Sequence, residues 1–235
     1  MIRNIFANHG ITITEEQEQK LNQYYDLLID WNNKINLTSI VEYEEVIWKH
    51  FLDSAFFVSC DKVDLKEKKK VLDLGTGAGF PGMVLAILCP NYEFVLADSL
   101  NKRIEFLKVV INRLQIHNVS VIHGRAEELG RNENFRNQFD YVVSRAVAEL
   151  PVLLEYCIPF VKKGGYFVSY KSRRLDEEIE NADNALNMLY TKYDKKYKYE
   201  LEYDHSERYL VFFRCKNITD SKYPRKPKKI KTNPL

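Results

Sequence analysis

The sequence predicts an α/β fold: a doubly wound, mostly parallel sheet of seven strands, with an antiparallel hairpin at one edge and a helical cap at the N-terminus. Three observations lead to this fold. From residue 70 onward, apolar runs typical of buried parallel strands alternate with segments at helical spacing. Before residue 60 the apolar residues recur only at helical spacing. Near the end, two strand-like segments follow each other as in a hairpin.

Length and composition indicate three parts that form one compact unit. We expect residues 1–62 to form the helical cap, 63–215 the α/β core and 216–235 a basic tail. A length of 235 residues with 45% apolar content allows a sizeable hydrophobic core and excludes a disordered chain. The net charge of +2 excludes no partner, but residues 221–235 hold six Lys or Arg and no acid.

The cap is expected to contain two helices. Residues 14–17, Thr-Glu-Glu-Gln, match a capping box at the start of the first. Residues 36–39 end that helix, and residues 44–58 form the second. The apolar positions that define the first helix are Leu21, Tyr24, Leu28, Trp31 and Ile35.

The core is expected to alternate strands and helices, which implies parallel pairing with helices on both faces. The strands are expected at 70–74, 93–98, 119–124, 139–145 and 164–172, and the hairpin at 196–203 and 208–215. The helices are expected at 81–88, 101–114, 149–157 and 175–190, with Pro81 in the first turn of its helix.

Several function classes are excluded by what the sequence lacks. The cysteines at 60, 89, 157 and 215 have no zinc-ligand or redox spacing, so we expect reduced core thiols and no metal site. The N-terminus is too polar for a signal peptide, and the longest apolar stretch is too short to span a bilayer. We therefore expect a cytoplasmic protein with no membrane partner.

Glycines crowd the turn after the first strand. Gly75, Gly77 and Gly79 allow a tight turn and a close approach of backbone to a ligand, and the following helix would point free N–H groups at it. Residues 77–82 match the dinucleotide pattern G-x-G-x-x-G, but the register counted from the strand end begins at Gly75 and places Phe80 at the sixth position. The dinucleotide reading is therefore weak.

A different pattern fits residues 71–79 in register. Val-Leu-Asp-Leu-Gly-Thr-Gly-Ala-Gly resembles motif I of the class I S-adenosylmethionine (SAM) methyltransferases. Asp73 would suit the ammonium end of SAM. Asp98, at the end of the second strand, is expected to accept hydrogen bonds from ribose hydroxyls, with capping of the next helix as the alternative. In a SAM fold, residues 124–128 would lie beside the adenine; on their own they read as a solvated turn.

The end of the fourth strand bears on the reaction class. Ser144-Arg145-Ala146 lacks the Asn/Asp-Pro-Pro-aromatic motif of exocyclic-amine methyltransferases. The only Cys-Pro pair, at 89–90, lies away from the site, which disfavours a cysteine nucleophile. An acceptor that already carries a lone pair remains, and guanine N7 is one. Arg145 could hold an acceptor base or phosphate, or form a structural ion pair. Lys171 is a further candidate for the substrate face.

Together the motifs resemble the ribosomal RNA small subunit methyltransferase G family, also called glucose-inhibited division protein B. The resemblance spans nearly the whole chain and rests on residues 73–82, Gly124-Arg125-Ala126-Glu127, Ser144-Arg145-Ala146 and the ends 223–226 and 233–235. In the cap it rests on Tyr24, 27–28, 31–32, 36–38, His50 and 53–54.

The resemblance implies a Rossmann-like class I methyltransferase that uses SAM to methylate guanine N7 in the 530 loop of 16S ribosomal RNA. It also implies SAM contacts at Gly75, Phe80, Ala126, Glu127 and Arg145. With such a substrate, the tail, whose prolines resist helix formation, would contact phosphates through its lysines. Taken alone, it is equally typical of a disordered solubilising segment. The tail residues expected to bind RNA are Arg225, Lys226, Lys228, Lys229 and Lys231.

Other interpretations stay open at this point. A SAM methyltransferase for a small molecule or a protein is one, and a non-catalytic RNA-binding module is another. His50 and Asp53, three residues apart on one helix, read equally well as a local pair or as substrate contacts. We expect a monomer whose partner is 16S ribosomal RNA or the small ribosomal subunit, and we expect no binding of DNA.

Overall fold

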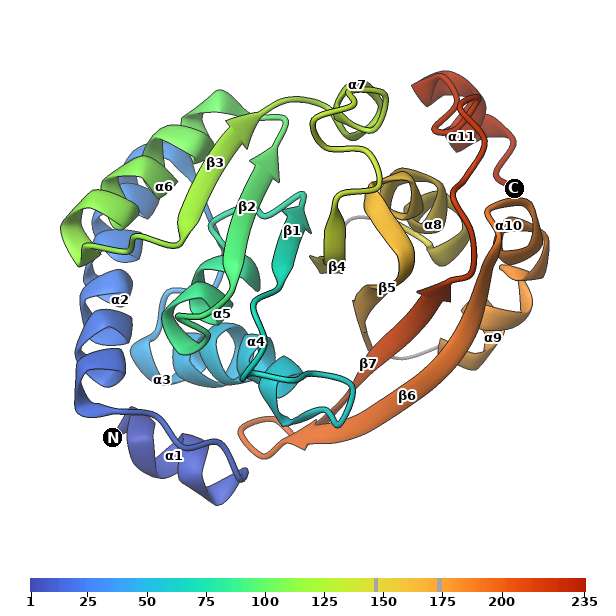
Figure 1. Ribbon diagram of the computed structural model, residues 1–235. Coiled ribbons are helices and arrows are strands. Elements are labelled where there is room, and N and C mark those ends of the chain that lie inside the picture. Colours follow the sequence, from blue (N-terminus) through green and yellow to red (C-terminus); the bar gives the residue numbers. More distant parts are fainter. Residues whose placement is uncertain (146–147, 173–174) are drawn as a thin grey trace.

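The computed structural model describes residues 1–145, 148–172 and 175–235 (Figure 1). In these parts of the chain a seven-stranded sheet has the order β3-β2-β1-β4-β5-β7-β6. Strands β1 to β5 pair parallel with one another, and β7 is antiparallel to both β5 and β6. This confirms the doubly wound sheet with an antiparallel edge. The strands are β1 (Lys70–Leu74), β2 (Glu93–Asp98), β3 (Val119–His123), β4 (Phe139–Arg145), β5 (Val161–Lys171), β6 (Thr191–Leu201) and β7 (Ser206–Cys215).

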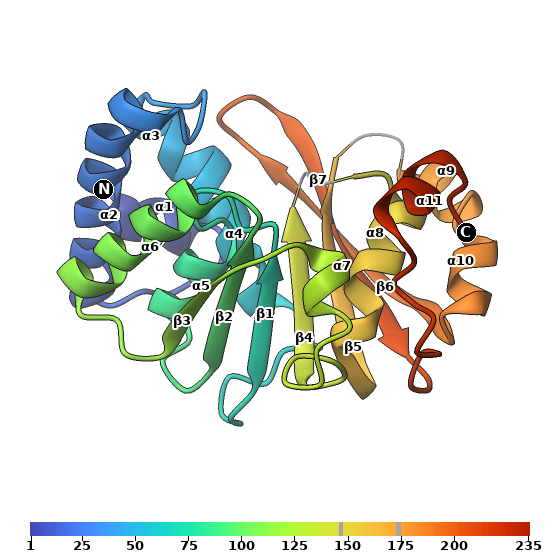
Figure 2. The ribbon, with the colours of Figure 1, turned by 90° about the horizontal axis from the view of Figure 1, so that it is seen from above.

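Helices cover both faces of the sheet (Figure 2). One face carries α2 (Glu15–Ile35), α4 (Asp53–Ala55), α5 (Gly82–Leu88) and α6 (Asn101–Leu114). The other carries α8 (Leu150–Cys157), the 3-10 turn η3 (Ile158–Phe160), α9 (Leu175–Glu180) and α10 (Asp183–Met188). Each face has its own cluster of buried apolar side chains, because strands buried on both sides present apolar residues alternately to each layer.

The N-terminal cap joins the first of these clusters. It begins with α1 (Ile2–Asn8), which the periodicity did not indicate, and continues into α2. The capping box is confirmed: the side chain of Thr14 accepts from the N–H of Gln17, whose own side chain accepts from the N–H of Thr14. Helix α2 ends where Asn36 adopts a left-handed conformation.

The single helix expected over 44–58 is instead a run of short segments. They are α3 (Tyr43–Val46), the π-helical turn η1 (Ile47–Leu52), α4 and the 3-10 turn η2 (Phe56–Ser59). The N–H of Asp53 reaches the carbonyl of Trp48, five residues back, which is the wide turn of a π-helix. This turn carries His50 into the functional site described below.

Two further expectations were wrong in the second half of the chain. Residues 175–190 form two helices, α9 and α10, because the N–H of Ala182 bonds the carbonyl of Ile179 and closes the first helix. The tail forms a helix, α11 (Pro227–Thr232), although its prolines were expected to prevent one. Pro227 occupies the first turn, where no N–H is needed. A short helix after β3, α7 (Ala126–Leu129), was also not anticipated.

Candidate active site

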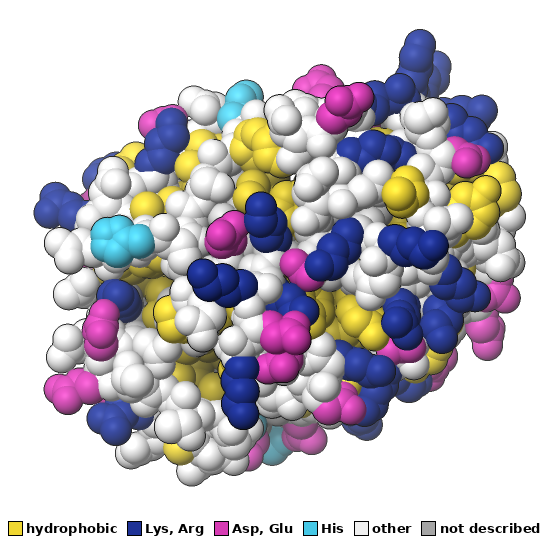
Figure 3. Space-filling model, in the orientation of Figure 1, with side chains coloured by type: hydrophobic (Ala, Val, Ile, Leu, Met, Phe, Trp, Pro, Cys, Tyr) yellow, Lys and Arg dark blue, Asp and Glu magenta, His cyan; other side chains and the backbone are white. Residues whose placement is uncertain are grey.

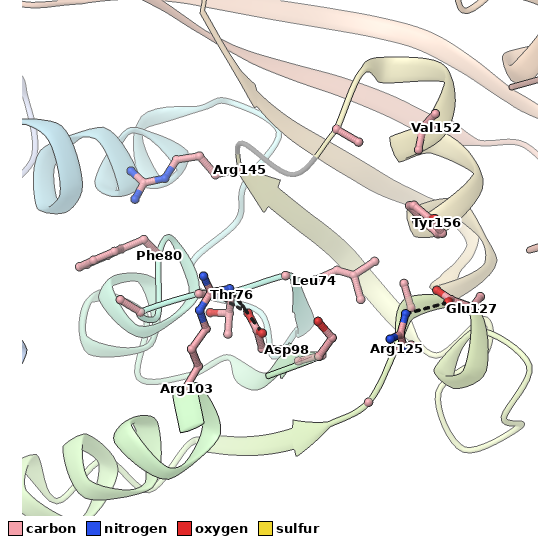
Figure 4. A pocket seen from close by; sticks show the side chains of 18 of the residues that line it. Leu74, Thr76, Phe80, Asp98, Arg103, Arg125, Glu127, Arg145, Val152 and Tyr156 are labelled. Carbon is pink, nitrogen blue, oxygen red and sulfur yellow. Dashed lines mark hydrogen bonds and ion pairs between the residues drawn. The ribbon is translucent and has the colours of Figure 1, made fainter. Parts of the chain in front are cut away.

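A cavity of about 720 Å³ opens at the carboxyl ends of β1, β2 and β4, where the strand order reverses. Its size is that of a small-molecule pocket, roughly 300–1,000 Å³. In Figure 4, Phe80 and Arg145 stand on one side, Tyr156 and Glu127 on the other, and Asp98 lies between them. The N-terminal cap and the C-terminal tail both contribute to its rim.

The loop after β1 needs glycine for two different reasons. The backbone angle φ is +61° at Gly77 and +101° at Gly79, a region that side chains disfavour. A Cβ atom on Gly79 would lie 2.3 Å from the hydroxyl oxygen of Tyr24, so this glycine permits packing against the cap. A Cβ atom on Gly77 would meet nothing within 4 Å, and Gly77 lines the cavity. The N–H of Gly75 ties the loop to β2 through the carbonyl of Ala97, at 2.9 Å.

Asp73 acts beneath this loop. It is fully buried and does not line the cavity, so the structure does not bring it to the ligand face as expected. Its Oδ2 accepts from Thr76 Oγ1 at 2.6 Å and from the N–H of Gly82 at 2.7 Å. Burial raises its pKa to about 6, against the effect of these hydrogen bonds.

The N–H groups at the start of α5 are used inside the protein. Gly82 donates to Asp73, and Met83 donates to the carbonyl of Gly79. The sequence predicted that these N–H groups would point at the ligand, which they do not. Pro81 was expected within the first turn of the helix, but it is the N-cap residue, and the helix begins at Gly82. The loop therefore offers its glycine backbone to a ligand, and the helix start only fixes the shape of the loop.

Asp98 links three segments around the cavity. Its Oδ2 accepts from the N–H of Gly77 at 2.9 Å and from Arg103 at 3.1 Å, and its Oδ1 accepts from the N–H of Leu100 at 2.9 Å. Helix α6 is capped by Leu100, with no side-chain cap from Asp98. A carboxylate has about four acceptor positions. Arg103 Nη1 also reaches Oδ1 at 3.5 Å, so contacts inside the protein use most of these positions, although Asp98 lines the cavity.

The segment after β3 supplies the opposite wall. Ala126 and Glu127, at the start of α7, both line the cavity. The Glu127 side chain is only 13% exposed and lies 4.0 Å from the guanidinium of Arg125 (Figure 4). This wall therefore presents a second carboxylate across the cavity from the glycine loop.

Arg145 ends β4 and joins the sheet to the cap. Its Nη1 donates to Asp53 Oδ2 at 2.7 Å, and its guanidinium lies 5.3 Å from the centre of the Phe80 ring. The ring of His50 stacks on the ring of Phe80, with 4.4 Å between the two ring centres. His50 and Asp53 therefore meet Arg145, and no bond between the two of them is recorded in the described chain. Ala146, quoted with Arg145 in the sequence motif, lies outside the described residues.

His50 is neutral in this arrangement. Burial, followed by the charge of Arg145, lowers its pKa to about 3. His50 Nδ1 lies 3.2 Å from Arg145 Nη2 and 3.1 Å from the carbonyl oxygen of Lys49. Nε2 shares a hydrogen bond with Thr38 Oγ1 at 3.0 Å. With both ring nitrogens engaged, His50 holds Arg145 in place and has no free nitrogen to act as a base.

The tail reaches the rim of the same cavity. Pro227, Lys231 and Pro234 line it, and the Lys231 side chain is exposed. Arg225 has a different position from the tail lysines: it makes a forked ion pair with Glu155, which is fully buried, with Nη2 to Oε2 at 2.6 Å. Arg225 therefore anchors the tail, and its guanidinium is not free for a phosphate.

Some site residues escaped the sequence-based analysis. Thr38 and Arg103 both line the cavity, and each orients a residue that was singled out. Arg103 lies five residues after Asp98 on the next helix, which could have indicated the pair. Glu155 is a lone acid in an otherwise apolar run, a signal for a buried ion pair. Lys171 does not line this cavity; it bonds Glu178 beside a second cavity.

Comparison with known proteins identifies the family. The model of the family described as rRNA small subunit methyltransferase G matches residues 17–204. Ribosomal RNA small subunit methyltransferase G of Lachnoclostridium phytofermentans is 49% identical over 92% of this chain and 88% of its own length. The protein of the same name from Alkaliphilus metalliredigens is 48% identical over 93% of this chain and 90% of its own. The chain belongs to this family.

Solved structures share the fold of this methyltransferase G family member. A SAM-dependent methyltransferase from Aquifex aeolicus superposes with a TM-score of 0.53 at 18% identity, covering 73% of this chain and 93% of that one. Methanococcus jannaschii fibrillarin, a pre-rRNA processing protein, gives 0.54 at 18% identity, over 70% and 74% of the two chains. The Rossmann-like methyltransferase fold expected from the sequence is confirmed.

The chain is thus a SAM-dependent rRNA methyltransferase, and its cavity fits SAM. Gly77 leaves space at the wall, and the carboxylates of Asp98 and Glu127 offer acceptors for hydroxyl and amino groups. All four cysteines are free and buried, as expected. Among the described residues there is no cluster of side chains that could hold a metal ion, and no helix is long and apolar enough to cross a membrane.

Proposed function

We propose that this chain transfers the methyl group of SAM to N7 of a guanosine in the 530 loop of 16S ribosomal RNA. One observation favours an acceptor with its own lone pair. The described lining of the cavity offers neither a thiol nor a free imidazole nitrogen. Burial raises the pKa of Cys60 and Cys89 to about 12 and that of Cys215 to about 11, and it raises the pKa of Cys157 well above its usual range. Guanine N7 needs no base and no nucleophile, only placement and exclusion of water.

The cofactor is held by residues from the three walls. SAM supplies an electrophilic methyl group on a sulfonium. We assign the backbone of Gly75 and Gly77 to close contact with it, and Asp98 to the ribose hydroxyls. Gly79 and Asp73 shape the loop from behind without facing the cofactor. Ala126 and Glu127 would read the adenine side of the cavity.

The acceptor side is formed by Phe80 and Arg145. Phe80 is 6% exposed, packs between His50 and Tyr24, and closes the cavity wall. Arg145 is fixed by Asp53 and His50, so its orientation is set before a substrate arrives. A preorganised cation beside the reacting atoms can position the acceptor without later reorganisation.

The tail is assigned to RNA binding through four lysines. Lys226, Lys228, Lys229 and Lys231 are exposed, and among the described residues none has a carboxylate partner. Basic side chains gather where α11 lies, at the upper right of Figure 3. Because Lys231 is also at the rim of the cofactor cavity, RNA held by these lysines would be close to the reacting centre. Arg225 drops out of this set because it binds Glu155.

The remaining partner assignments are also proposals. We propose a cytoplasmic monomer that acts on 16S ribosomal RNA or on the small ribosomal subunit, and that has no DNA or membrane partner. We also propose an organisation into a cap over 1–62, a core over 63–215 and a tail over 216–235, and the clusters of buried side chains that these parts share support one compact unit.

Radiolabelled SAM tests the reaction. Small ribosomal subunits that lack the modification are incubated with the protein, and the digested RNA is analysed for 7-methylguanosine. We expect label in that nucleoside at one site of 16S RNA. Label in another nucleoside, or SAM binding without transfer to RNA, would contradict the proposed acceptor.

Two glycines provide a matched test of the cofactor loop. Gly77 and Gly10 both have positive φ, +61° and +73°, and at both a Cβ would meet nothing within 4 Å. Gly10 does not line the cavity. We expect Gly77→Val to abolish SAM binding in calorimetry and Gly10→Val to leave it unchanged, at a similar cost in stability. Equal SAM affinity in the two variants would contradict the assignment of the loop.

A further inference from the structure

A second cavity, of about 470 Å³, adjoins the first. His50 and Arg145 line both cavities, so the two meet at these side chains. A methyl group passes in line from the sulfonium to its acceptor, which requires the two bound molecules to approach at one point. The shared wall provides such a point. The second cavity is large enough for a nucleotide, given the usual range of roughly 300–1,000 Å³ for ligand pockets.

The cavity is lined by charged side chains of both signs. The cations are Lys49, Arg145, Lys171 and Arg208, and the carboxylates are Asp53 and Glu178. Lys49 also pairs with Glu45 and Asp204, which lie outside the lining. His50 adds no charge because its pKa is lowered to about 3. Ile40 and the ring of Tyr170 add apolar surface. Charged donors and acceptors beside apolar surface can hold a base and its phosphate.

One pair in this cavity is matched to guanine. Lys171 Nζ donates to Glu178 Oε2 at 2.5 Å and to the carbonyl of Ala148 at 3.3 Å. Glu178 Oε2 also accepts from the N–H of Leu150 at 3.1 Å. Both of these hydrogen bonds of Glu178 end on Oε2. Among the described residues none donates to Oε1, so this oxygen can accept a hydrogen bond from a ligand. The Lys171 side chain is 10% exposed and that of Glu178 is 26% exposed, so both are held at the wall and still reachable.

We propose that this second cavity is the acceptor-base site, in which Glu178 accepts from the N1–H and 2-amino groups of the target guanine and Lys171 donates to its O6. This rests on the proposed function and names the residues that select its base. Guanine presents adjacent donors on its Watson–Crick edge, which a carboxylate matches, and adenine presents a different pattern there. Contacts on that edge leave N7 unbonded, as the acceptor atom must be. Arg145, at the junction, then lies beside the reacting atoms.

The test pairs a protein variant with a nucleotide analogue. Inosine lacks the 2-amino group but keeps N7, N1–H and O6. Small subunits are reconstituted with guanosine or inosine at the acceptor position, and kcat/KM is measured with labelled SAM. For the unaltered protein we expect inosine to reduce kcat/KM about tenfold or more, which is the scale of one base-edge contact. In Glu178→Gln the guanosine reaction should fall by a similar factor, and the further loss with inosine should be less than about threefold.

Controls separate this inference from the proposed function. Glu177→Gln changes the neighbouring exposed residue of α9, which does not line the cavity, and should keep full activity and full inosine discrimination. SAM affinity by calorimetry should be the same in all these proteins. Lys171→Met, which keeps the aliphatic stem, should lower kcat/KM on guanosine subunits with SAM affinity unchanged.

Two outcomes would overturn different statements. If Glu178→Gln discriminates against inosine as strongly as the unaltered protein does, Glu178 does not read the base, and the inference is wrong while the methyltransferase remains. If the unaltered protein places no label in 7-methylguanosine on guanosine subunits, the proposed function itself is wrong. Loss of SAM binding in Glu178→Gln would also overturn the inference, because it would place Glu178 on the cofactor side.

Discussion

The N-terminal cap and the C-terminal tail reach the same cavity by different kinds of contact. The cap is held by apolar packing: Tyr24 and Phe51 pack on Phe80, and Phe106 of α6 packs on Tyr24. The rings of Tyr24, Phe51 and Phe106 are fully buried. Two arginines hold the tail, one from the core and one from the tail itself. Arg136 donates to the carbonyls of Thr219 and Tyr223, and Arg225 binds Glu155. The cap thus shapes the site through apolar packing, whereas the tail is held by arginines and by buried Ile230 and presents its lysines to solvent.

Because the two regions are held differently, we expect variants in them to change the free energy of unfolding by different amounts. The largest loss is expected from the cap. Phe51→Ala removes a fully buried ring that stacks on Tyr24, 5.7 Å between ring centres, and should cost about 3–5 kcal/mol. Denaturant unfolding measures this. A loss below about 1 kcal/mol would mean that the cap packs less tightly than the structure indicates.

The tail anchor is expected to come second. Arg225→Met leaves the fully buried carboxylate of Glu155 without its partner and should cost about 3 kcal/mol. The double variant Arg225→Met with Glu155→Leu should recover most of this loss, because no buried charge remains. If the double variant unfolds as easily as the single one, the geometry of the pair matters more than its charge. Denaturant unfolding of both proteins distinguishes these results.

His50, at the junction between the cap and the sheet, should make the free energy of unfolding depend on pH. The pKa of His50 is lowered from 6.5 to about 3 in the folded chain. As the pH falls below 6.5 the unfolded chain takes up a proton that the folded chain does not, so stability is lost. Between pH 6.5 and pH 5 this amounts to about 2 kcal/mol.

His50→Gln should remove that part of the pH dependence. The raised pKa of Asp73 acts in the opposite direction, since it favours the folded chain as the pH falls toward 3.8, but it is common to both proteins. The difference between the two unfolding free energies should therefore change with pH only through His50. A difference that stays constant from pH 7 to pH 5 would show that His50 does not titrate with the expected shift.

The smallest effect on stability is expected from the tail lysines. Changing Lys226, Lys228, Lys229 and Lys231 together to Gln should alter the unfolding free energy by no more than about 0.5 kcal/mol, since all four are exposed. Their effect on RNA binding should be large, with the slope of log affinity against log salt reduced by about one per lysine in phosphate contact.

The edge strand β6 provides a control for these lysines. It carries four of its own, Lys192, Lys195, Lys196 and Lys198, each near a carboxylate. Changing these four to Gln removes the same charge from another place. We expect the salt slope of RNA binding to stay as in the unaltered protein. Equal slopes for the two quadruple variants would mean that total charge, and not the tail, governs binding.

The sequence was most informative where structure is local. The capping box at Thr14, the strand over 70–74 and the helix over 101–114 were all predicted with their bounds, because periodicity and capping act within a few residues. The predictions failed where distant segments intervene. The π-helical turn at 47–52 and the break between α9 and α10 depend on what each segment packs against, and the helix in the tail depends on buried Ile230.

By itself, the sequence determined the sheet, the glycine loop after its first strand and the family, because each of these depends on patterns of neighbouring residues along the chain. Only the tertiary structure decided what the charged residues do. Asp73 is turned under the loop, Arg225 is paired with a buried acid, and His50, Asp53 and Arg145 form one group from residues more than 90 positions apart. The partner of a charge is set by which elements pack together, and that is a property of the whole fold.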